Sequence, residues 1–238
     1  SADKTIEFIF EMEKAGADLI EIGVPFSDPT AEGPVIQDAN IRALNKGITM
    51  DDIFGIVEKV REKTQIPLVF LTYMNPVHHY GYEAFFAKCE ETGVDGIITP
   101  ELPYEEKGEL KDFADRHGID LISMIAPTSD ERIQMIAKES SGFVYVVSSL
   151  GVTGVRSNIT TDVETIVGKI KEVTDVPCAV GFGISTPEQA GALAAVSDGA
   201  IVGSAIVKII AEHGDAAGPE LYKYVKSMKD ACRQGIQY

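Results

Sequence analysis

Cysteine is scarce in this chain, with three residues among 238. Cys89, Cys178 and Cys232 lie far apart and have neither CxxC nor Cys/His spacing. Such a set excludes a disulfide scaffold and offers no zinc-binding motif. We therefore expect a protein of a reducing compartment, the cytoplasm.

Positive charge is also in short supply, because 21 Lys and Arg residues face 37 Asp and Glu residues, a formal net charge of −16 at pH 7. A field of that sign repels nucleic-acid phosphates and anionic membrane surfaces. The apolar runs, such as residues 142–147, are far shorter than the ~20 residues that cross a bilayer. We expect neither nucleic acid nor membrane as a partner, and a phosphorylated ligand must be held by local groups.

No stretch rich in Pro, Gly or Ser and no low-complexity segment divides the chain. Short apolar runs instead alternate with amphipathic stretches from end to end, which is typical of repeated βα units with a parallel sheet. We therefore predict an α/β protein with a single domain, residues 1–238. The predicted strands are residues 19–24, 67–74, 96–100, 120–126, 142–148, 177–183 and 199–204. The clearest helix patterns are residues 4–15, 50–63, 82–92, 106–117, 130–138, 162–173 and 220–233.

The pattern starts on a helix, whereas every later helix follows a strand. A closed (β/α)8 barrel requires eight strands, and an open one leaves unpaired edges. We therefore expect a TIM barrel whose first strand would precede Ser1; the alternative is an ordinary arrangement of seven strands.

Several helices have recognisable N-terminal caps. Ser1 or Asp3 is expected to cap the first helix, and Thr49 and Ser129 are expected to cap two later ones. Ser185 and Glu188 have the spacing of a capping box, with Pro187 near the first helical position.

A carboxylate interrupts the first predicted strand. Alternation places Glu21 on one face with Leu19 and Gly23, while three aliphatic residues occupy the other face. Parallel strands are covered on both faces, so Glu21 is expected to be partly buried. Burial without a partner raises the pKa of a carboxyl group, which makes a general acid or base near neutrality. The alternative is a structural glutamate paired with Lys or Arg.

An acidic loop with several prolines, residues 25–34, follows this strand directly. Active sites of α/β barrels are built at the carboxyl ends of the strands. Asp28, Glu32 and the later Asp38 are therefore candidate site residues, although most acidic loop residues are simply solvated.

Glycine-rich turns follow the last two predicted strands, around residues 181–184 and 199–204. Glycine lets backbone N–H groups approach an anion, helix N-termini supply partial positive charge, and the last strands of barrels frequently bind phosphate. We predict a phosphate site there; the alternative is tight turn packing. The loop 151–154 is suited to a lid, and Tyr145 lies in a strand where tyrosine is ordinarily a core residue.

The segment 16–29, GADLIEIGVPFSDP, closely resembles the signature of the tryptophan synthase α-subunit family. Four further motifs follow in the family's order and spacing: TYMNP at 72–76, GVTG at 151–154, GFGIS at 181–185 and GSAIV at 203–207. The resemblance implies a TIM barrel and a lyase without a cofactor. The implied reaction is retro-aldol cleavage of indole-3-glycerol phosphate to indole and glyceraldehyde 3-phosphate.

The resemblance also implies roles for single residues. Glu21 matches the family's catalytic glutamate, Glu32 stands in place of its second catalytic carboxylate, and Tyr145 matches its active-site tyrosine. Thr153 falls in the lid, and the implied partner is a tryptophan synthase β-subunit in an α2β2 complex. The implied phosphate-binding residues are Gly154, Gly183, Ile184, Gly203 and Ser204. The implied indole pocket consists of Leu71, Tyr73, Ile98, Pro100, Met124 and Phe182.

Two positions depart from the family's pattern, since Glu32 and Glu101 each stand where the family has aspartate. A longer side chain shifts the carboxylate, and a displacement on the order of 1 Å can cost about a hundredfold in rate. The alternatives to an α-subunit are a free-standing lyase that releases indole, and an inactive scaffold or binding partner. A sugar-phosphate epimerase barrel fits less well, because no set of His and acidic residues suits a metal.

Overall fold

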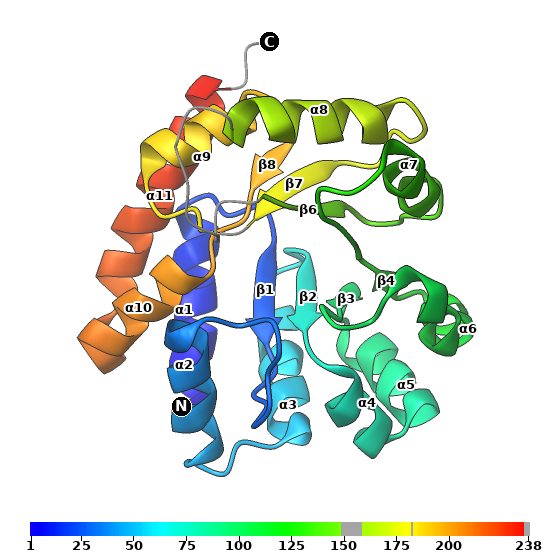
Figure 1. Cartoon of the computed structure of the whole chain (residues 1–238). Helices are drawn as coiled ribbons and strands as arrows, with labels where there is room; N and C mark the ends of the chain where they lie inside the picture. The colour runs from blue at the N-terminus through cyan, green and yellow to red at the C-terminus, as the bar shows by residue number, and fades with distance from the viewer. Residues whose placement is uncertain (149–158, 182, 236–238) are drawn as a thin grey trace. The chain divides into compact units, whose positions relative to one another are not determined.

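The computed structural model describes residues 1–148, 159–181 and 183–235. The chain groups into two compact units, residues 1–121 with 207–223, and residues 122–206 with those from 224 on. Each unit contains one parallel four-stranded sheet (Figure 1). Among the described residues, no helix is long and apolar enough to span a membrane.

The sheet of the first unit has the order β1-β2-β3-β4. Its register places Glu21 beside Val69, and Gly23 beside Leu71, which in turn lies beside Ile98. The strands are β1 (Ile20–Gly23), β2 (Leu68–Leu71), β3 (Gly96–Ile98) and β4 (Asp120–Leu121). The helices are α1 (Ala2–Lys14), α2 (Pro34–Leu44), α3 (Met50–Arg61), α4 (Met74–Tyr80), α5 (Tyr82–Thr92) and α6 (Gly108–His117), with a 3₁₀ turn at Tyr104–Glu106.

The second sheet has the order β5-β6-β7-β8, and every strand pair in it is parallel. The strands are β5 (Ser123–Ile125), β6 (Val144–Val147), β7 (Cys178–Gly181) and β8 (Gly199–Ala200). The helices α7 (Asp130–Lys138), α8 (Ile159–Lys171) and α9 (Pro187–Ala194) connect them. The chain continues with α10 (Ser204–His213), a 3₁₀ turn at Gly214–Ala216 and α11 (Gly218–Gly235).

Each of the seven apolar runs predicted as strands contains a strand, but the run at residues 120–126 contains two. The chain breaks at Ile122, because β4 takes its hydrogen bonds from β3 whereas β5 takes them from β6. Periodicity within one run carries no information on which neighbour each half will pair with, so the sequence predicted one strand. The single domain and the strand before Ser1 stay predictions.

Helix caps follow the sequence except at one helix. Ser1 and Ser129 accept hydrogen bonds from backbone N–H groups of α1 and α7, and Thr49 forms a capping box with Asp52 in α3. The prediction for α9 was wrong by one residue, since its capping box joins Thr186 and Gln189. Pro187 is the cause: it has no N–H and occupies the first helical position, which makes the preceding Thr186 the cap.

Aromatic rings fill the core of the first unit. Phe54 of α3 lies 5.6 Å from Phe70 of β2 and 5.7 Å from Phe85 of α5, measured between ring centroids. Phe85 meets Phe86 edge to face at 5.4 Å. These side chains are almost completely buried. They fix α3 and α5 against the outer face of β2, the side opposite Leu71 and Val69.

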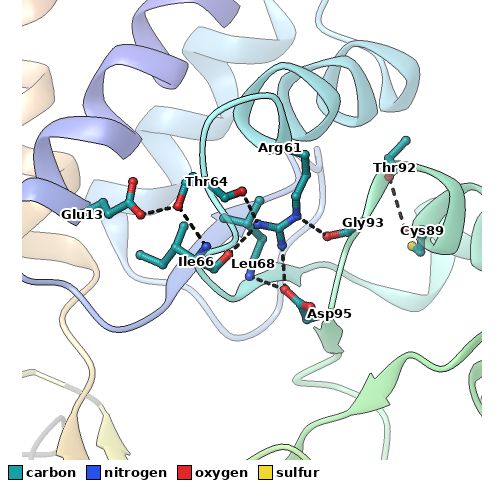
Figure 2. Close-up of polar contacts among 9 residues, drawn as sticks. All are labelled: Glu13, Arg61, Thr64, Ile66, Leu68, Cys89, Thr92, Gly93 and Asp95. Carbon is teal, nitrogen blue, oxygen red and sulfur yellow. Dashed lines mark hydrogen bonds and ion pairs between the residues drawn. The ribbon is translucent and has the colours of Figure 1, made fainter.

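An ionic clasp fastens the amino ends of β2 and β3 (Figure 2). Arg61, the last residue of α3, donates to the carbonyl oxygens of Gly93 and Ile66 and to Asp95 Oδ2, at 2.7–2.8 Å. Asp95 Oδ2 also accepts from Leu68 N at 2.8 Å, and Asp95 N donates to Leu68 O. We call Arg61, Ile66, Leu68 and Asp95 the Arg61 clasp. It joins a helix end to two strands.

The second unit contains the same device at the amino ends of β7 and β8. Lys171, the last residue of α8, donates to Val176 O at 3.1 Å and pairs with Asp198 Oδ2 at 2.9 Å. Asp198 accepts from Cys178 N at 2.7 Å and returns a bond from its own N–H to Cys178 O. Burial opposes ionisation of Asp198, yet the bonds from Cys178 and Lys171 outweigh it and lower its pKa. We call Lys171, Val176, Cys178 and Asp198 the Lys171 clasp.

The Arg61→Ala variant should lower the free energy of unfolding by about 2–3 kcal/mol, because several net hydrogen bonds are lost. The Arg61 side chain is only 13% exposed, so water cannot fully replace them. Lys59→Ala on the same helix is the matched control. Its ion pair with Asp3, at 3.5 Å, lies in solvent and should contribute less than about 1 kcal/mol. Urea unfolding measures both, and equal effects would contradict a special role for Arg61.

Candidate functional site

Glu21 lies in the middle of β1, among aliphatic neighbours. Ile20 and Ile22 on either side of it are each 6% exposed and point to the opposite face, as strand alternation predicted. Glu21 itself is half-buried, as expected for a parallel strand covered on both faces. Its face of the sheet carries Val69 and Gly96 in register across β2 and β3. Gly96 is needed there, because a Cβ atom would approach Asp120 O to 2.9 Å. A carboxyl group thus lies on an otherwise small and apolar surface.

Burial raises the pKa of Glu21 to about 7. Removal from water is the cause, and among the described residues no Lys or Arg forms an ion pair with Glu21. This observation favours a titrating acid over the structural ion pair that the sequence left open. Near neutrality such a group exists in both protonation states, which is the requirement for a general acid and base.

Glu32 lies between α2 and the end of β2. Its carboxylate accepts a hydrogen bond from Asn40 Nδ2 at 2.6 Å and a second from the Tyr73 hydroxyl. Burial raises the pKa of Glu32, while the bonds from Asn40 and Tyr73 act in the opposite direction. The other two acids of this region, Asp28 and Asp38, are exposed.

Tyr145 lies in β6, with Met124 of β5 beside it in register, and both side chains are half-buried. The ring of Tyr145 reaches across β7, because a Cβ atom on Gly181 would collide with it. Gly181 therefore serves to admit this ring, whereas the sequence interpretation treated it as part of an anion-binding turn, with tight turn packing as the alternative.

The residues predicted for the indole pocket occupy strand ends in both units. In the first unit, Leu71 and Ile98 are neighbours across β2 and β3, on the same face as Glu21. Tyr73 follows β2, is 2% exposed and packs on Phe26 at 5.3 Å. Pro100 follows β3 and is half-buried. Phe182, Thr153 and Gly154 lie outside the described residues.

The two predicted phosphate turns follow neighbouring strands of the second sheet. Gly183, with φ of 80°, and the buried Ile184 come after β7, whereas Gly203 and Ser204 join β8 to α10. Ile201 N donates to Val180 O at 2.7 Å, so the carboxyl ends of the two strands lie side by side. Within the turn after β7, Gln189 Oε1 already accepts from the N–H groups of Ser185 and Thr186.

Glu101, the second departure from the family's pattern, follows β3, and its side chain contacts the start of α4. Its carboxylate accepts a hydrogen bond from Met74 N at 2.5 Å. It also borders a cavity of about 360 Å³, together with Met74 and His78. In the described part of the chain, no group of three or more His, Cys, Asp or Glu side chains has a geometry that would hold a metal ion.

Sequence reasoning missed Asn40 as a site residue. It is 8% exposed on a helix that otherwise has no buried residue. A buried amide is costly unless it is hydrogen-bonded. An asparagine at a helix position otherwise suited to apolar residues, eight residues after a candidate acid, was therefore the available signal.

The first unit has a glutamate with a pKa near neutrality in a parallel strand, and the second has glycine turns at the ends of two parallel strands. Both are features of α/β enzymes that perform acid–base chemistry. The family model "Tryptophan synthase alpha chain" matches residues 1–234. The chain belongs to the tryptophan synthase alpha chain family. It is therefore a carbon–carbon lyase of tryptophan biosynthesis, which cleaves indole-3-glycerol phosphate.

Individual relatives agree with this assignment. The tryptophan synthase alpha chain of Lactiplantibacillus plantarum is 51% identical over 230 residues, which is 96% of this chain and 87% of the relative. That of Lacticaseibacillus casei is 46% identical over 229 residues, 96% of this chain and 86% of the relative.

Solved structures of the family show the fold. A tryptophan synthase α2β2 complex from Pyrococcus furiosus matches with a TM-score of 0.88 and 36% identity, over 97% of this chain and 93% of that chain. The alpha chain from Legionella pneumophila matches with a TM-score of 0.86 and 34% identity, over 97% and 86%. The predicted fold class, the TIM barrel, is thereby confirmed.

Glu21→Gln should make the protein more stable at pH 8, by up to about 3 kcal/mol, and leave it unchanged at pH 4. The folded-state pKa of about 7 exceeds the ordinary 4.5, so the folded state holds the proton more tightly. The stability of the parent is therefore fully present below about pH 4.5 and is lost as pH rises through about 7. A neutral amide has no such loss.

Urea unfolding at pH 4 and pH 8 measures this difference. Glu62→Gln, at an exposed position, is the control and should change stability by less than about 0.5 kcal/mol at either pH. A Glu21→Gln variant no more stable than its parent at pH 8 would show that Glu21 is not desolvated.

Proposed function

We propose that Glu21 moves both protons of the retro-aldol cleavage. The observation that carries this proposal is its raised pKa on an apolar strand face. The protonated carboxyl donates to C3 of the indole ring, which interrupts the aromaticity of the ring and makes it an electron sink. The resulting carboxylate then removes the proton of the glycerol hydroxyl next to the scissile bond.

The electrons balance in this sequence. As the hydroxyl loses its proton, a C=O bond forms and the C–C bond to C3 breaks, and that electron pair restores the aromatic ring. The products are indole and glyceraldehyde 3-phosphate, and Glu21 ends protonated, ready for the next turnover. No external oxidant or cofactor is needed.

Glu32 is proposed to accept the indole N–H while C3 is protonated. Positive charge develops on the ring nitrogen at that moment, so a carboxylate at the N–H stabilises the intermediate. Tyr145 is proposed as an active-site residue, because it resembles the family's active-site tyrosine. Leu71, Ile98, Tyr73, Pro100, Met124 and Phe182 are proposed to form the apolar walls that a flat aromatic ring requires.

The phosphate group is proposed to bind to backbone N–H groups of Gly154, Gly183, Ile184, Gly203 and Ser204, with Thr153 in the lid. Neither glycine turn contains Lys or Arg, so main-chain donors and the start of α10 must supply the positive potential. Because Gln189 occupies the N–H groups of Ser185 and Thr186, the earlier residues of the turn are the better donors.

We further propose a β-subunit partner in an α2β2 complex. The support is that this chain is similar to alpha chains solved in tryptophan synthase complexes from Pyrococcus furiosus. A cytoplasmic location is proposed as well, which the three free cysteines support.

Glu21→Gln should abolish cleavage, because an amide cannot transfer the proton, while the phosphate site keeps its affinity. We expect a loss of at least about a hundredfold in kcat. Release of indole is the assay, and binding of glyceraldehyde 3-phosphate and circular dichroism are the controls. Turnover at the rate of the parent in a folded variant would reject Glu21 as the acid.

Gly203→Asp should raise KM for the phosphorylated substrate by about tenfold or more, because a carboxylate repels phosphate. The position suits the test, since a Cβ atom at Gly203 meets no atom within 4 Å and the fold should tolerate it. Gly203→Ala is the uncharged control and should change KM much less. If the aspartate variant bound substrate as tightly as the parent, the phosphate site would lie elsewhere.

A further inference from the structure

We propose that Asn40 and the Tyr73 hydroxyl are positioning residues that hold the Glu32 carboxylate, and that together they adapt this site to a glutamate. The inference rests on the proposed role of Glu32 in accepting the indole N–H. It assigns two residues that act through Glu32.

Three side chains from two separate elements, α2 and the end of β2, meet at Glu32. Gln37 Nε2 of α2 donates to the main-chain oxygen of Glu32 at 2.7 Å, which fixes the loop. Asn40 Nδ2, one turn further along α2, donates to the carboxylate oxygen Oε2 at 2.6 Å. From the end of β2, the Tyr73 hydroxyl accepts from Ala31 N at 3.2 Å and donates to the same carboxylate. Backbone and carboxylate of Glu32 are thus held by different groups.

Packing fixes both donors before any substrate binds. Asn40 is 8% exposed and Tyr73 is 2% exposed, and the ring of Phe26 covers Tyr73. A hydroxyl has one proton to give. Because the Tyr73 oxygen accepts the N–H of Ala31, its own proton is directed to Glu32. Neither donor can turn away without leaving a buried polar group unpaired.

The two donors also set the charge of Glu32. Burial raises the pKa of Glu32, and the hydrogen bonds from Asn40 and Tyr73 lower it. Burial likewise raises the pKa of Tyr73, to about 12, and the carboxylates of Glu32 and Glu101 contribute, so Tyr73 remains a donor. Stabilisation of the positive charge that develops on the indole nitrogen requires the ionised carboxylate. Asn40 and Tyr73 therefore extend the pH range over which Glu32 can act.

The lengths of the Glu32 and Asn40 side chains suit the hydrogen bond between them. Shortening Glu32 to aspartate withdraws the carboxylate by roughly 1.5 Å, one C–C bond. The 2.6 Å contact with Asn40 would then exceed hydrogen-bond range. Replacing Asn40 by glutamine adds one methylene to the donor side chain, so the hydrogen bond to the shortened carboxylate can form again. This exchange tests positioning, because a purely structural role gives no reason for the two changes to compensate.

The first experiment measures kcat and KM of Glu32→Asp, Asn40→Gln and the double variant. Each single variant should lose about tenfold to a hundredfold in kcat with a smaller change in KM, as expected for a misplaced carboxylate. The double variant should recover most of the loss. A folded double variant no more active than the poorer single variant would overturn the inference.

The second experiment measures the pH dependence of kcat for Asn40→Ala and Tyr73→Phe. Each substitution removes one donor that favours the ionised form of Glu32, which raises the pKa of Glu32. The acidic limb of the pH profile of kcat should therefore move up by about one pH unit. Gln37→Ala is the matched control, since it loosens the loop without touching the carboxylate. Its acidic limb should stay in place, whatever its kcat.

Glu32→Ala separates this inference from the proposed function. If it is impaired but the limb of Asn40→Ala coincides with that of the parent, the positioning role is wrong and the role of Glu32 stands. If Glu32→Ala is fully active, Glu32 is not catalytic and both fall. Circular dichroism and thermal unfolding confirm that each variant is folded.

Discussion

The clasp between a basic helix end and an aspartate that precedes the next strand is the constraint on which each sheet depends. In each unit the basic side chain, Arg61 or Lys171, donates to the carbonyl oxygen of the residue before a proline. The aspartate, Asp95 or Asp198, accepts from the first N–H group of the strand that follows this proline. Parallel strands have no tight turn to set their register. The clasps fix it at the amino ends, and the carboxyl ends, where the candidate site residues lie, are aligned as a consequence.

Register then decides the chemistry of each strand face. In the first unit it places Glu21 beside Val69, which in turn lies beside Gly96, and neither residue can neutralise the carboxyl group. The folded state therefore favours the protonated form of Glu21, which lowers the free energy of unfolding as pH rises above neutrality. In the second unit, register allows the ring of Tyr145 to cover Gly181. The same backbone constraint therefore produces a destabilised acid in one unit and a packed tyrosine in the other.

Local patterns in the sequence predicted much of this. Alternation in β1 predicted the strand face that Glu21 occupies, and single residues such as Thr49 and Ser129 predicted helix starts, because these effects act within a few residues. The break at Ile122 and the clasp of Arg61 with Asp95 were not predicted, since they depend on partners chosen far along the chain. The bond from Asn40 to Glu32 was missed for a related reason: it exists only once the loop folds back onto α2.

The charge of the chain gives the raised pKa of Glu21 a second consequence under the proposed mechanism. With a net charge of −16, the protein repels the phosphorylated substrate at long range. An ionised Glu21 would add repulsion at the site itself, whereas the protonated form that burial favours is both neutral and ready to donate to C3. Glu32, which has to be ionised, has its negative charge stabilised by hydrogen bonds from Asn40 and Tyr73. Two carboxyl groups can thus act on one anionic substrate, because burial favours the neutral form of Glu21 while hydrogen bonds from buried donors stabilise the charge of Glu32.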